Sequence, residues 1–543
     1  MNFLRLARLL LGTVPGLACA AAPTAPATPI TSKSEDETLA RMVRAHVVFL
    51  GDDLLEGRGT GQRGHQVAAL YAAAHFQRLG LRPAGDAGSF LQRAEFIEST
   101  HALDRGRFRF QPQAPADALV LEAPADVLVS PAPGETEVEL TAPAVFLGYG
   151  IRAPDFNHDD LAGVDLKGRF AIVLSGSPPW LPSEPRAHYA ATKAEVLAAT
   201  GAVGIISLTT PRDHARYPWA FRINSSRFPA MRLIDADGKI YLGFPSLRAN
   251  AGVSHGSAQK LFSTLGKNFD TTVAQAEARE RVGFAWPGTF TLGAAATVRK
   301  ASSANVVALL PGTDPALAGE PLVVTAHLDH IGIGPAIDGD AIYNGVMDNA
   351  MGSSILLTLA ELFARGPAPR RPILFAALTA EEKGLLGAYQ LARRPPVGIR
   401  RFAANLNVDM PLFLRPTRDV VGWGAEHTTL GRVLDAAAVR QGFKLHPDPL
   451  PDETLFVRSD QYPFIREGVP ALYLGTLLGS PEDAFLKNRY HKPSDDLAQP
   501  IDWPSAGAFT RVFSEIVRTV AADPAAPRWH PDGFFRKQFA PDR

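Results

Sequence analysis

The chain has 543 residues, with 55 basic and 55 acidic side chains, so its formal net charge at neutral pH is zero. A balanced charge gives no global attraction to nucleic acid or anionic lipid, and we expect no nucleic-acid partner. Hydrophobic residues make up 46% and charged residues 20% of the chain, which excludes a largely disordered protein. The 47 glycines and 45 prolines indicate many turns and exclude a coiled coil.

The first twenty residues have the layout of a secretory signal peptide. Arg5 and Arg8 precede a short apolar run, and small residues flank Cys19 in an A-x-A pattern. We therefore expect an exported protein, periplasmic or secreted, with a signal peptide at 1–20 and a linker at 21–35. The alternatives are a lipoprotein anchored through Cys19, which Gly16 disfavours, and a short N-terminal helix on a cytosolic protein. No later stretch is apolar enough to predict a transmembrane segment.

Composition and periodicity divide the rest of the chain into parts. The run 66–80 predicts an amphipathic helix, with Val67, Leu70, Tyr71, Ala74 and Phe76 near helical spacing, and belongs to a first part of the main domain at 36–120. From 121 to 290, short apolar runs such as AVFLGYGI and GRFAIVLSG alternate with Gly, Pro and Asp, which indicates a β-rich insert. The main domain then resumes at 291–525, before a C-terminal tail at 526–543.

The second part of the main domain alternates continuous apolar runs with helical patterns. The runs PLVVTA, PILFAAL and FAANLNV alternate with SSILLTLAELFARG and KGLLGAYQLARR, which read as helices. Strands that are apolar throughout are buried on both faces. We therefore predict an α/β fold with a mixed, largely parallel central sheet that helices cover on both faces.

Imidazoles and carboxylates follow these apolar runs, at the edge of the sheet where α/β proteins bind ligands. Each one alone has an ordinary explanation, such as a structural histidine or a helix N-cap. Together they would form a buried group of carboxylates, which is costly without a cation, so we predict a metal site. Its candidate residues are His327, Asp329, Asp348, Glu381, Glu382, Asp409 and His491.

The types of ligand narrow the choice of metal. Imidazole and carboxylate together suit zinc, with manganese or cobalt as alternatives, and the absence of thiolates favours a catalytic site. Two imidazoles and three carboxylates exceed what one open zinc site needs. Two ions that share one carboxylate account for the excess, and a glutamate outside the ligand set can then serve as general base.

At these residues the sequence resembles the M28 family of zinc peptidases, in particular the secreted aminopeptidases that carry an inserted protease-associated domain. The segments HLDHIG, GDAIYNGVMDNAMGSS, TAEEKGLLGA, NVDM, RSDQYPF and RYHKPSD follow one another in the family's order. GYGIRAP, DLKGRFAIVL and KAEVLAATGAVGII resemble the protease-associated insert. The resemblance implies the zinc exopeptidase fold and two zinc ions per chain.

The resemblance also implies a role for each matching residue. Asp348 would bridge two zinc ions and would be followed by a cis peptide bond to Asn349, and Glu381 would take the proton from the bridging water. Asp329 would orient His327, as partners of metal-bound histidines usually do. The remaining ligands would be His327 and Asp409 on one ion, and Glu382 and His491 on the other.

The sequence departs from the family's pattern at Met351 and Gln461, where a small residue and a histidine are more usual. His330, Asp460 and Tyr462 are candidates to line the substrate pocket. Other histidines, such as His427 and His446, are expected to be ordinary structural or surface residues.

The leading functional prediction is an aminopeptidase that acts on peptides with a free N-terminus. A carboxypeptidase or dipeptidase of the same fold, and a one-zinc glutaminyl cyclase, are alternatives. A non-enzymatic binding protein on a peptidase scaffold is a further alternative, which the complete ligand set disfavours. The preferred side chain, the role of the insert and the oligomeric state stay open.

Overall fold

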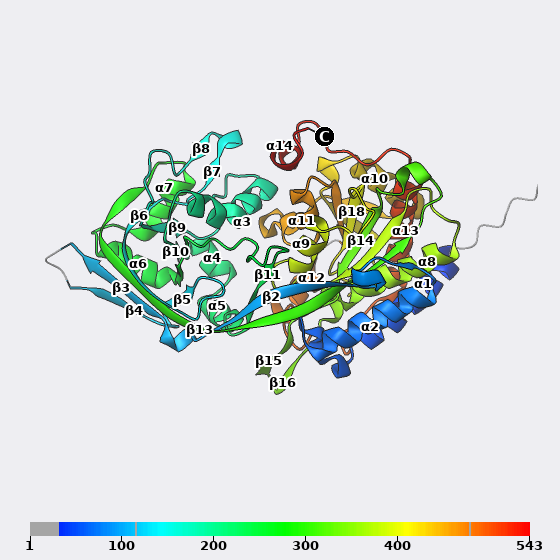
Figure 1. Ribbon diagram of the computed structural model, residues 1–543, viewed down its shortest axis with the longest axis horizontal. Helices are drawn as coiled ribbons and strands as arrows, with labels where there is room; N and C mark the ends of the chain where they lie inside the picture. The colour runs from blue at the N-terminus through cyan, green and yellow to red at the C-terminus, as the bar shows by residue number, and fades with distance from the viewer. Residues whose placement is uncertain (1–31, 114–116, 477–478, 543) are drawn as a thin grey trace, which may run out of the picture.

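The computed structural model describes residues 32–113, 117–476 and 479–542. The expected signal peptide, Cys19 and most of the expected linker lie outside the described residues. Figure 1 shows two lobes side by side, with one long strand, β13 (Phe284–Leu310), running through both. Of the helices in the described ranges, none is both long enough and apolar enough to cross a bilayer.

The larger lobe is built on a mixed sheet whose central strands β17, β14, β18 and β21 are parallel. Its outer strands are mostly antiparallel, since β13 pairs antiparallel with both β17 and β2. This agrees with the predicted mixed sheet. The strands in spatial order are β11 (Ala230–Ile234), β2 (Leu91–His101), β13, β17 (Ile373–Leu378), β14 (Leu322–His327), β18 (Ala404–Val408), β21 (Ala471–Gly475), β19 (Asp419–Trp423) and β20 (Lys444–His446), and the short β1 (Arg82–Pro83) also pairs with β13.

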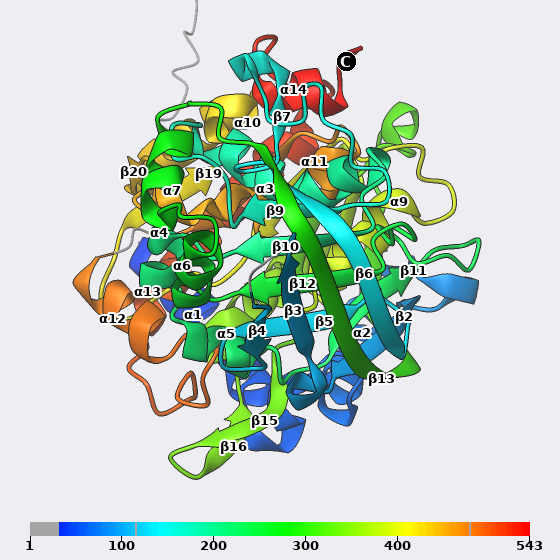
Figure 2. The same cartoon turned by 90° about the vertical axis from the view of Figure 1, so that its left-hand side faces the viewer.

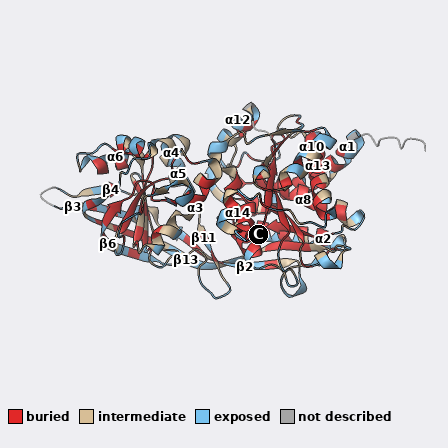
Figure 3. Ribbon diagram, turned by 90° about the horizontal axis from the view of Figure 1, so that it is seen from above, coloured by how far each residue is buried: buried red, intermediate tan, exposed pale blue. Residues whose placement is uncertain are grey.

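Helices cover both faces of this sheet, because successive side chains of its central strands point to opposite sides. Val324 and Phe375 pack into one hydrophobic cluster, whereas their neighbours Val323 and Leu374 pack into another. Figure 3 shows the strands as a buried layer between helices. The first cluster includes α1 (Ser32–Leu50), α2 (Arg63–Arg78), α8 (Met351–Arg365), α10 (Leu430–Gln441) and α13 (Trp503–Ala522), and the second includes α9 (Leu386–Arg393) and α11 (Gln461–Arg466).

The smaller lobe has a sheet of its own, which faces the viewer in Figure 2. It also has its own hydrophobic cluster. Strands β6, β9, β10 and β12 are parallel, and β5 is antiparallel to β12. The strands in order are β4 (Leu119–Glu122), β3 (Arg107–Pro112), β13, β6 (Glu137–Phe146), β9 (Phe170–Leu174), β10 (Gly204–Leu208), β12 (Ala249–Val253) and β5 (Val127–Pro131), with helices α3 (Ser183–Ala199), α4 (Pro211–Arg216), α5 (Trp219–Ser225), α6 (His255–Ser263) and α7 (Phe269–Glu277).

Several of the predicted boundaries between the main domain and the insert differ from the boundaries in the structure. Strand β3, at residues 107–112, already belongs to the smaller lobe, so the boundary at 121 lies too late. Conversely, β11 lies inside the range 121–290 but pairs with β2 of the larger sheet. The reason is that β13 changes partners along one unbroken strand, from β6 and β3 to β2, which leaves no break in composition.

The predicted termini and one predicted helix also need correction. Helix α1 begins at Ser32, inside the expected linker 21–35. The expected tail 526–543 contains α14 (Phe534–Phe539), which buries Phe535 completely. The helix predicted at 66–80 is confirmed as α2, but Leu70 on its predicted apolar face is 62% exposed, because the small alanines Ala68 and Ala72 form the buried face instead.

Candidate metal centre

The candidate ligands lie at the carboxyl ends of the parallel strands, as predicted. His327 is the last residue of β14, and Asp409 follows directly after β18. Glu381 and Glu382 follow β17 after two residues. Asp348 lies in the turn before α8, and its peptide bond to Asn349 is cis, as the resemblance implied.

The distances divide the ligand atoms into two groups on either side of Asp348. His327 Nε2 lies 2.9 Å from Asp409 Oδ1 and 3.3 Å from Asp348 Oδ1. His491 Nε2 lies 3.2 Å from Asp348 Oδ2 and 3.3 Å from Glu382 Oε2. Zinc bonds of about 2.1 Å at tetrahedral angles place ligand atoms about 3.4 Å apart. The residues therefore fit two cations that share Asp348.

His330 is an additional member of the second group. Its Nδ1 lies 2.7 Å from Glu382 Oε1 and 3.9 Å from Asp348 Oδ2, and its ring is 5.7 Å from that of His491. The side chain is completely buried. The sequence offered His330 only as a pocket residue, and its place directly after Asp329 in HLDHIG was the available signal. His330 and His491 therefore both lie close to the carboxylates of Glu382 and Asp348.

The electrostatics of the cluster show strong coupling between imidazoles and carboxylates. Burial favours neutral His327, yet Asp409 and Glu381 raise its pKa well above the usual value. Burial likewise opposes ionisation of Asp348, but hydrogen bonds from His327 and His491 hold the pKa of this carboxyl well below its usual range. Protons on the histidines thus compensate the buried carboxylates, and divalent cations would do so with neutral imidazoles as ligands.

Glu381 differs from its neighbour Glu382. It belongs to neither group of potential ligand atoms in the described part of the chain. Burial raises the pKa of Glu381 well above its usual value, although His327 opposes this shift. A buried carboxyl group with a raised pKa beside a metal site has the properties of a general acid–base group.

Asp329 contacts His327 through its main chain and Glu381 through its side chain. His327 Nδ1 donates to the backbone carbonyl of Asp329 at 3.0 Å, and not to its carboxylate. The carboxylate instead accepts from the Thr60 hydroxyl at 2.7 Å and from the backbone N–H of Glu381 at 3.1 Å. Asp329 therefore orients His327 through its main chain and Glu381 through its side chain.

Polar residues behind the ligands hold Asp409 in place. The Ser459 hydroxyl donates to Asp409 Oδ2 at 2.6 Å, and Asn407 Nδ2 donates to Ser459 Oγ at 2.9 Å. Asn407 Nδ2 also lies 2.9 Å from Gln461 Oε1, while Gln461 Nε2 donates to the carbonyl of Phe456 at 2.7 Å. The departure from the family's pattern at Gln461 is thus a buried structural contact.

Two residues that the sequence analysis did not single out support the turn around Asp348. Asp495 accepts the backbone N–H groups of Met347, at 3.0 Å, and Asp348, at 3.1 Å. The buried guanidinium of Arg58 donates to the carbonyls of Asn344, at 2.7 Å, and Gly345, at 2.9 Å. Asp495 lies in the RYHKPSD segment, but no periodicity in the sequence indicated the role of Arg58.

Asp460 and Tyr462, the other two candidates for the substrate pocket besides His330, have different positions. Asp460 is completely buried, and burial raises its pKa well above the usual value despite the nearby His327. Tyr462 is also buried, but its hydroxyl lies 2.8 Å from Nδ1 of His188 on α3. Tyr462 therefore takes part in the junction between the lobes and is withdrawn as a substrate-binding candidate.

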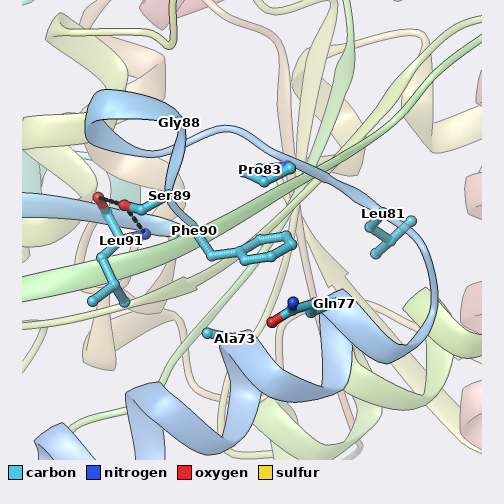
Figure 4. A pocket seen from close by; sticks show the side chains of 8 residues that line it. All are labelled: Ala73, Gln77, Leu81, Pro83, Gly88, Ser89, Phe90 and Leu91. Carbon is cyan, nitrogen blue, oxygen red and sulfur yellow. Dashed lines mark hydrogen bonds between the residues drawn. The ribbon is translucent and has the colours of Figure 1, made fainter.

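A hollow in the surface lies elsewhere, between α2 and residues 81–91 (Figure 4). Its lining includes Ala73, Gln77, Leu81 and Phe90, and none of its lining residues is a histidine or an acid. Without such groups it cannot bind a metal or transfer a proton. The groups that could bind a metal lie instead in the carboxylate and imidazole cluster around Asp348.

An α/β sheet with this cluster at the carboxyl ends of its strands defines a protein built to hold divalent cations in a buried site. The family model described as Peptidase family M28 matches residues 305–517, which contain all five expected ligands. A 72-residue stretch is 42% identical to a "Probable zinc metalloprotease" of Pyrenophora tritici-repentis, and it covers 13% of this chain and 16% of that protein.

Solved structures match over most of the chain. An "Aminopeptidase from Aneurinibacillus sp. strain AM-1" aligns with 91% of this chain and 97% of its own, at 18% identity and a TM-score of 0.54. A zinc aminopeptidase from Bacillus subtilis aligns with 88% of this chain and 94% of its own, at 19% identity and a TM-score of 0.43. At such low identity, the first of these matches shows the fold.

Proposed function

We propose that the protein is a zinc-dependent aminopeptidase that holds two zinc ions and hydrolyses the N-terminal bond of peptides. The observation that carries this proposal is the arrangement of two histidine and carboxylate groups around Asp348, with Glu381 outside both. Zinc ions bound there would polarise the substrate carbonyl and lower the pKa of water. His327 and Asp409 would hold one ion, and Glu382 and His491 the other.

Glu381 would move the proton in this reaction. Its carboxylate would accept a proton from the attacking water and donate it to the leaving amine. The raised pKa of Glu381 suits both transfers, because an effective acid–base group has a pKa near the working pH. Asp329 would keep Glu381 in position through its hydrogen bond to the backbone N–H.

We further propose that the smaller lobe limits the length of the substrate. Phe228, in the segment that leads from α5 of this lobe to β11, packs edge-on against Tyr343, with ring centres 5.8 Å apart. Lys383, the residue after Glu382, lies with its Nζ 6.0 Å from the centre of the Phe228 ring. An aromatic side chain beside the segment that carries Glu382 would favour short peptides, so Phe228→Ala should raise kcat/KM for long peptides relative to dipeptides. An unchanged ratio would contradict this role.

A panel of substrates tests the proposed activity. Aminoacyl-anilides, N-blocked peptides and peptides with N-terminal glutamine would be compared with and without a chelator. Cleavage of the anilides alone, abolished by chelator and restored by zinc, is the expected result. Cleavage of N-blocked peptides would indicate a carboxypeptidase instead, and cyclisation of N-terminal glutamine would indicate a cyclase.

We also propose, from the N-terminal leader, that the exported chain is processed after Ala20. N-terminal sequencing of the secreted protein tests this cleavage.

A further inference from the structure

A second group of potential ligands lies at the junction of the two lobes. Helix α3 of the smaller lobe contacts the larger lobe through polar pairs, among them Arg186 with Asp452 at 2.8 Å and Glu195 with Arg466 at 3.2 Å. Glu184, in the first turn of α3, reaches the 3-10 turn Ala425–His427 of the larger lobe. None of the candidate ligands around Asp348 takes part.

His427 is the centre of this group. Its Nε2 lies 3.8 Å from Oε1 of Glu426 and 4.0 Å from Oε1 of Glu184. The ring stacks on Phe456 and meets Phe535 edge-on, with centroid distances of 5.5 and 5.4 Å. Within the part of the chain that the structure describes, this buried nitrogen has no hydrogen-bond partner. An imidazole nitrogen that is held between two carboxylates and makes no hydrogen bond can donate its lone pair to a cation.

The three side chains are close to the spacing that a metal ion requires. Their potential ligand atoms all lie within 4.8 Å of one another. Tetrahedral zinc needs ligand atoms about 3.4 Å apart, so the His427 distances exceed the requirement by only about half an ångström. Glu426 is 59% exposed and free to adjust, whereas Glu184 is 16% exposed. A cation would also relieve the repulsion between two neighbouring carboxylates.

Another cluster of this kind away from Asp348, which is more deeply buried, does not have these properties. His46, His75 and Glu361 also place potential ligand atoms within 4.8 Å of one another. There, however, His75 Nε2 lies 3.2 Å from the Leu357 carbonyl, and Glu361 pairs with Arg78 at 3.2 Å and with Arg365. Two guanidinium groups already neutralise that carboxylate, so it needs no cation.

We propose that Glu184, Glu426 and His427 bind a divalent transition-metal ion such as Zn²⁺, which links the smaller lobe to the larger one. One imidazole and two carboxylates form a ligand set that suits zinc, manganese or cobalt. Glu184 belongs to the smaller lobe, whereas Glu426 and His427 belong to the larger lobe. An ion bound by all three residues therefore joins the two lobes.

Zinc content of the full chain tests the site. His427→Ala and Glu184→Gln would be equilibrated with zinc alone, dialysed, and compared with the unmodified protein by elemental analysis. Each variant should hold one zinc equivalent fewer than the unmodified protein. His446→Ala is the matched control, since His446 lies 2.8 Å from Asp419 and is 17% exposed, similar to the 14% of His427. This control should retain all of its zinc.

Asp348→Ala separates this inference from the proposed activity. Combined with His427→Ala, it should lose one more zinc equivalent than Asp348→Ala alone, and the zinc-induced rise in Tm that remains in Asp348→Ala should disappear. Unchanged zinc content in both His427→Ala and Glu184→Gln would overturn the junction site, even if Asp348→Ala loses its ions. Glu184→Gln keeps the size of the side chain, so it decides the question if His427→Ala does not fold.

Discussion

Replacement of Glu381 by glutamine tests the division of labour between two adjacent glutamates. The glutamine keeps the size of the side chain and the backbone N–H that donates to Asp329. Because Glu381 lies outside both groups of ligand atoms in the described residues, the variant should bind as much zinc as the unmodified protein. Only the ability to accept and return a proton is lost.

The expected loss of catalytic rate follows from the contribution of general acid–base catalysis, which is a factor of about 10² to 10⁴. Each tenfold change corresponds to about 1.4 kcal/mol, so the barrier should rise by about 3 to 5 kcal/mol. The effect should fall on kcat and leave KM nearly unchanged, because the carboxylate acts on water and on the leaving amine and not on substrate binding.

Steady-state kinetics with aminoacyl-anilides, together with zinc analysis of the same samples, measure both quantities. Glu382→Gln is the matched control: it should lose zinc as well as activity, because the Glu382 carboxylate lies 2.7 Å from His330 and 3.3 Å from His491. A Glu381→Gln variant with full zinc content and near-normal kcat would refute the assignment of Glu381 as the proton carrier.

Three further predictions concern the ligands and the core. Asp348→Ala should lose both catalytic ions together, since each oxygen of Asp348 faces a different histidine; elemental analysis showing both retained would rule out the bridge. Ser459→Ala should weaken zinc binding about 10- to 100-fold, measured by competition with a chelator, because the hydroxyl orients Asp409; unchanged affinity would count against this support. Burial, with His75 and Arg78 nearby, lowers the pKa of His46 to about 3, so the folded state binds fewer protons than the unfolded state below the usual pKa of 6.5. His46 alone should therefore lower the free energy of unfolding by about 1.4 kcal/mol for each pH unit between 6.5 and about 3, and His46→Gln should reduce the measured slope by that amount in denaturant titrations; an identical slope would show that His46 is not responsible.

The sequence by itself determined the fold class and the principal residues of the site. Strands buried on both faces must be apolar throughout, so β14, β17 and β18 were visible as continuous runs, and the residues that end them were visible as well. The sequence alone thus places His327, Glu382 and Asp409 at one edge of the sheet. Each apolar run and the residue that ends it are local features of the sequence, so they can be recognised without knowing where the other runs lie.

The tertiary structure alone decided how these residues contact one another. The bond from Thr60 to Asp329 and the support of Gly345 by Arg58 join positions more than 260 residues apart in the chain. The pairing of Glu184 with His427 depends equally on how the two lobes dock. Periodicity reports only which face of an element is buried, whereas such contacts depend on the path of the whole chain. The sequence therefore identified the chemistry of the site, and the fold determined which group holds each ligand in place.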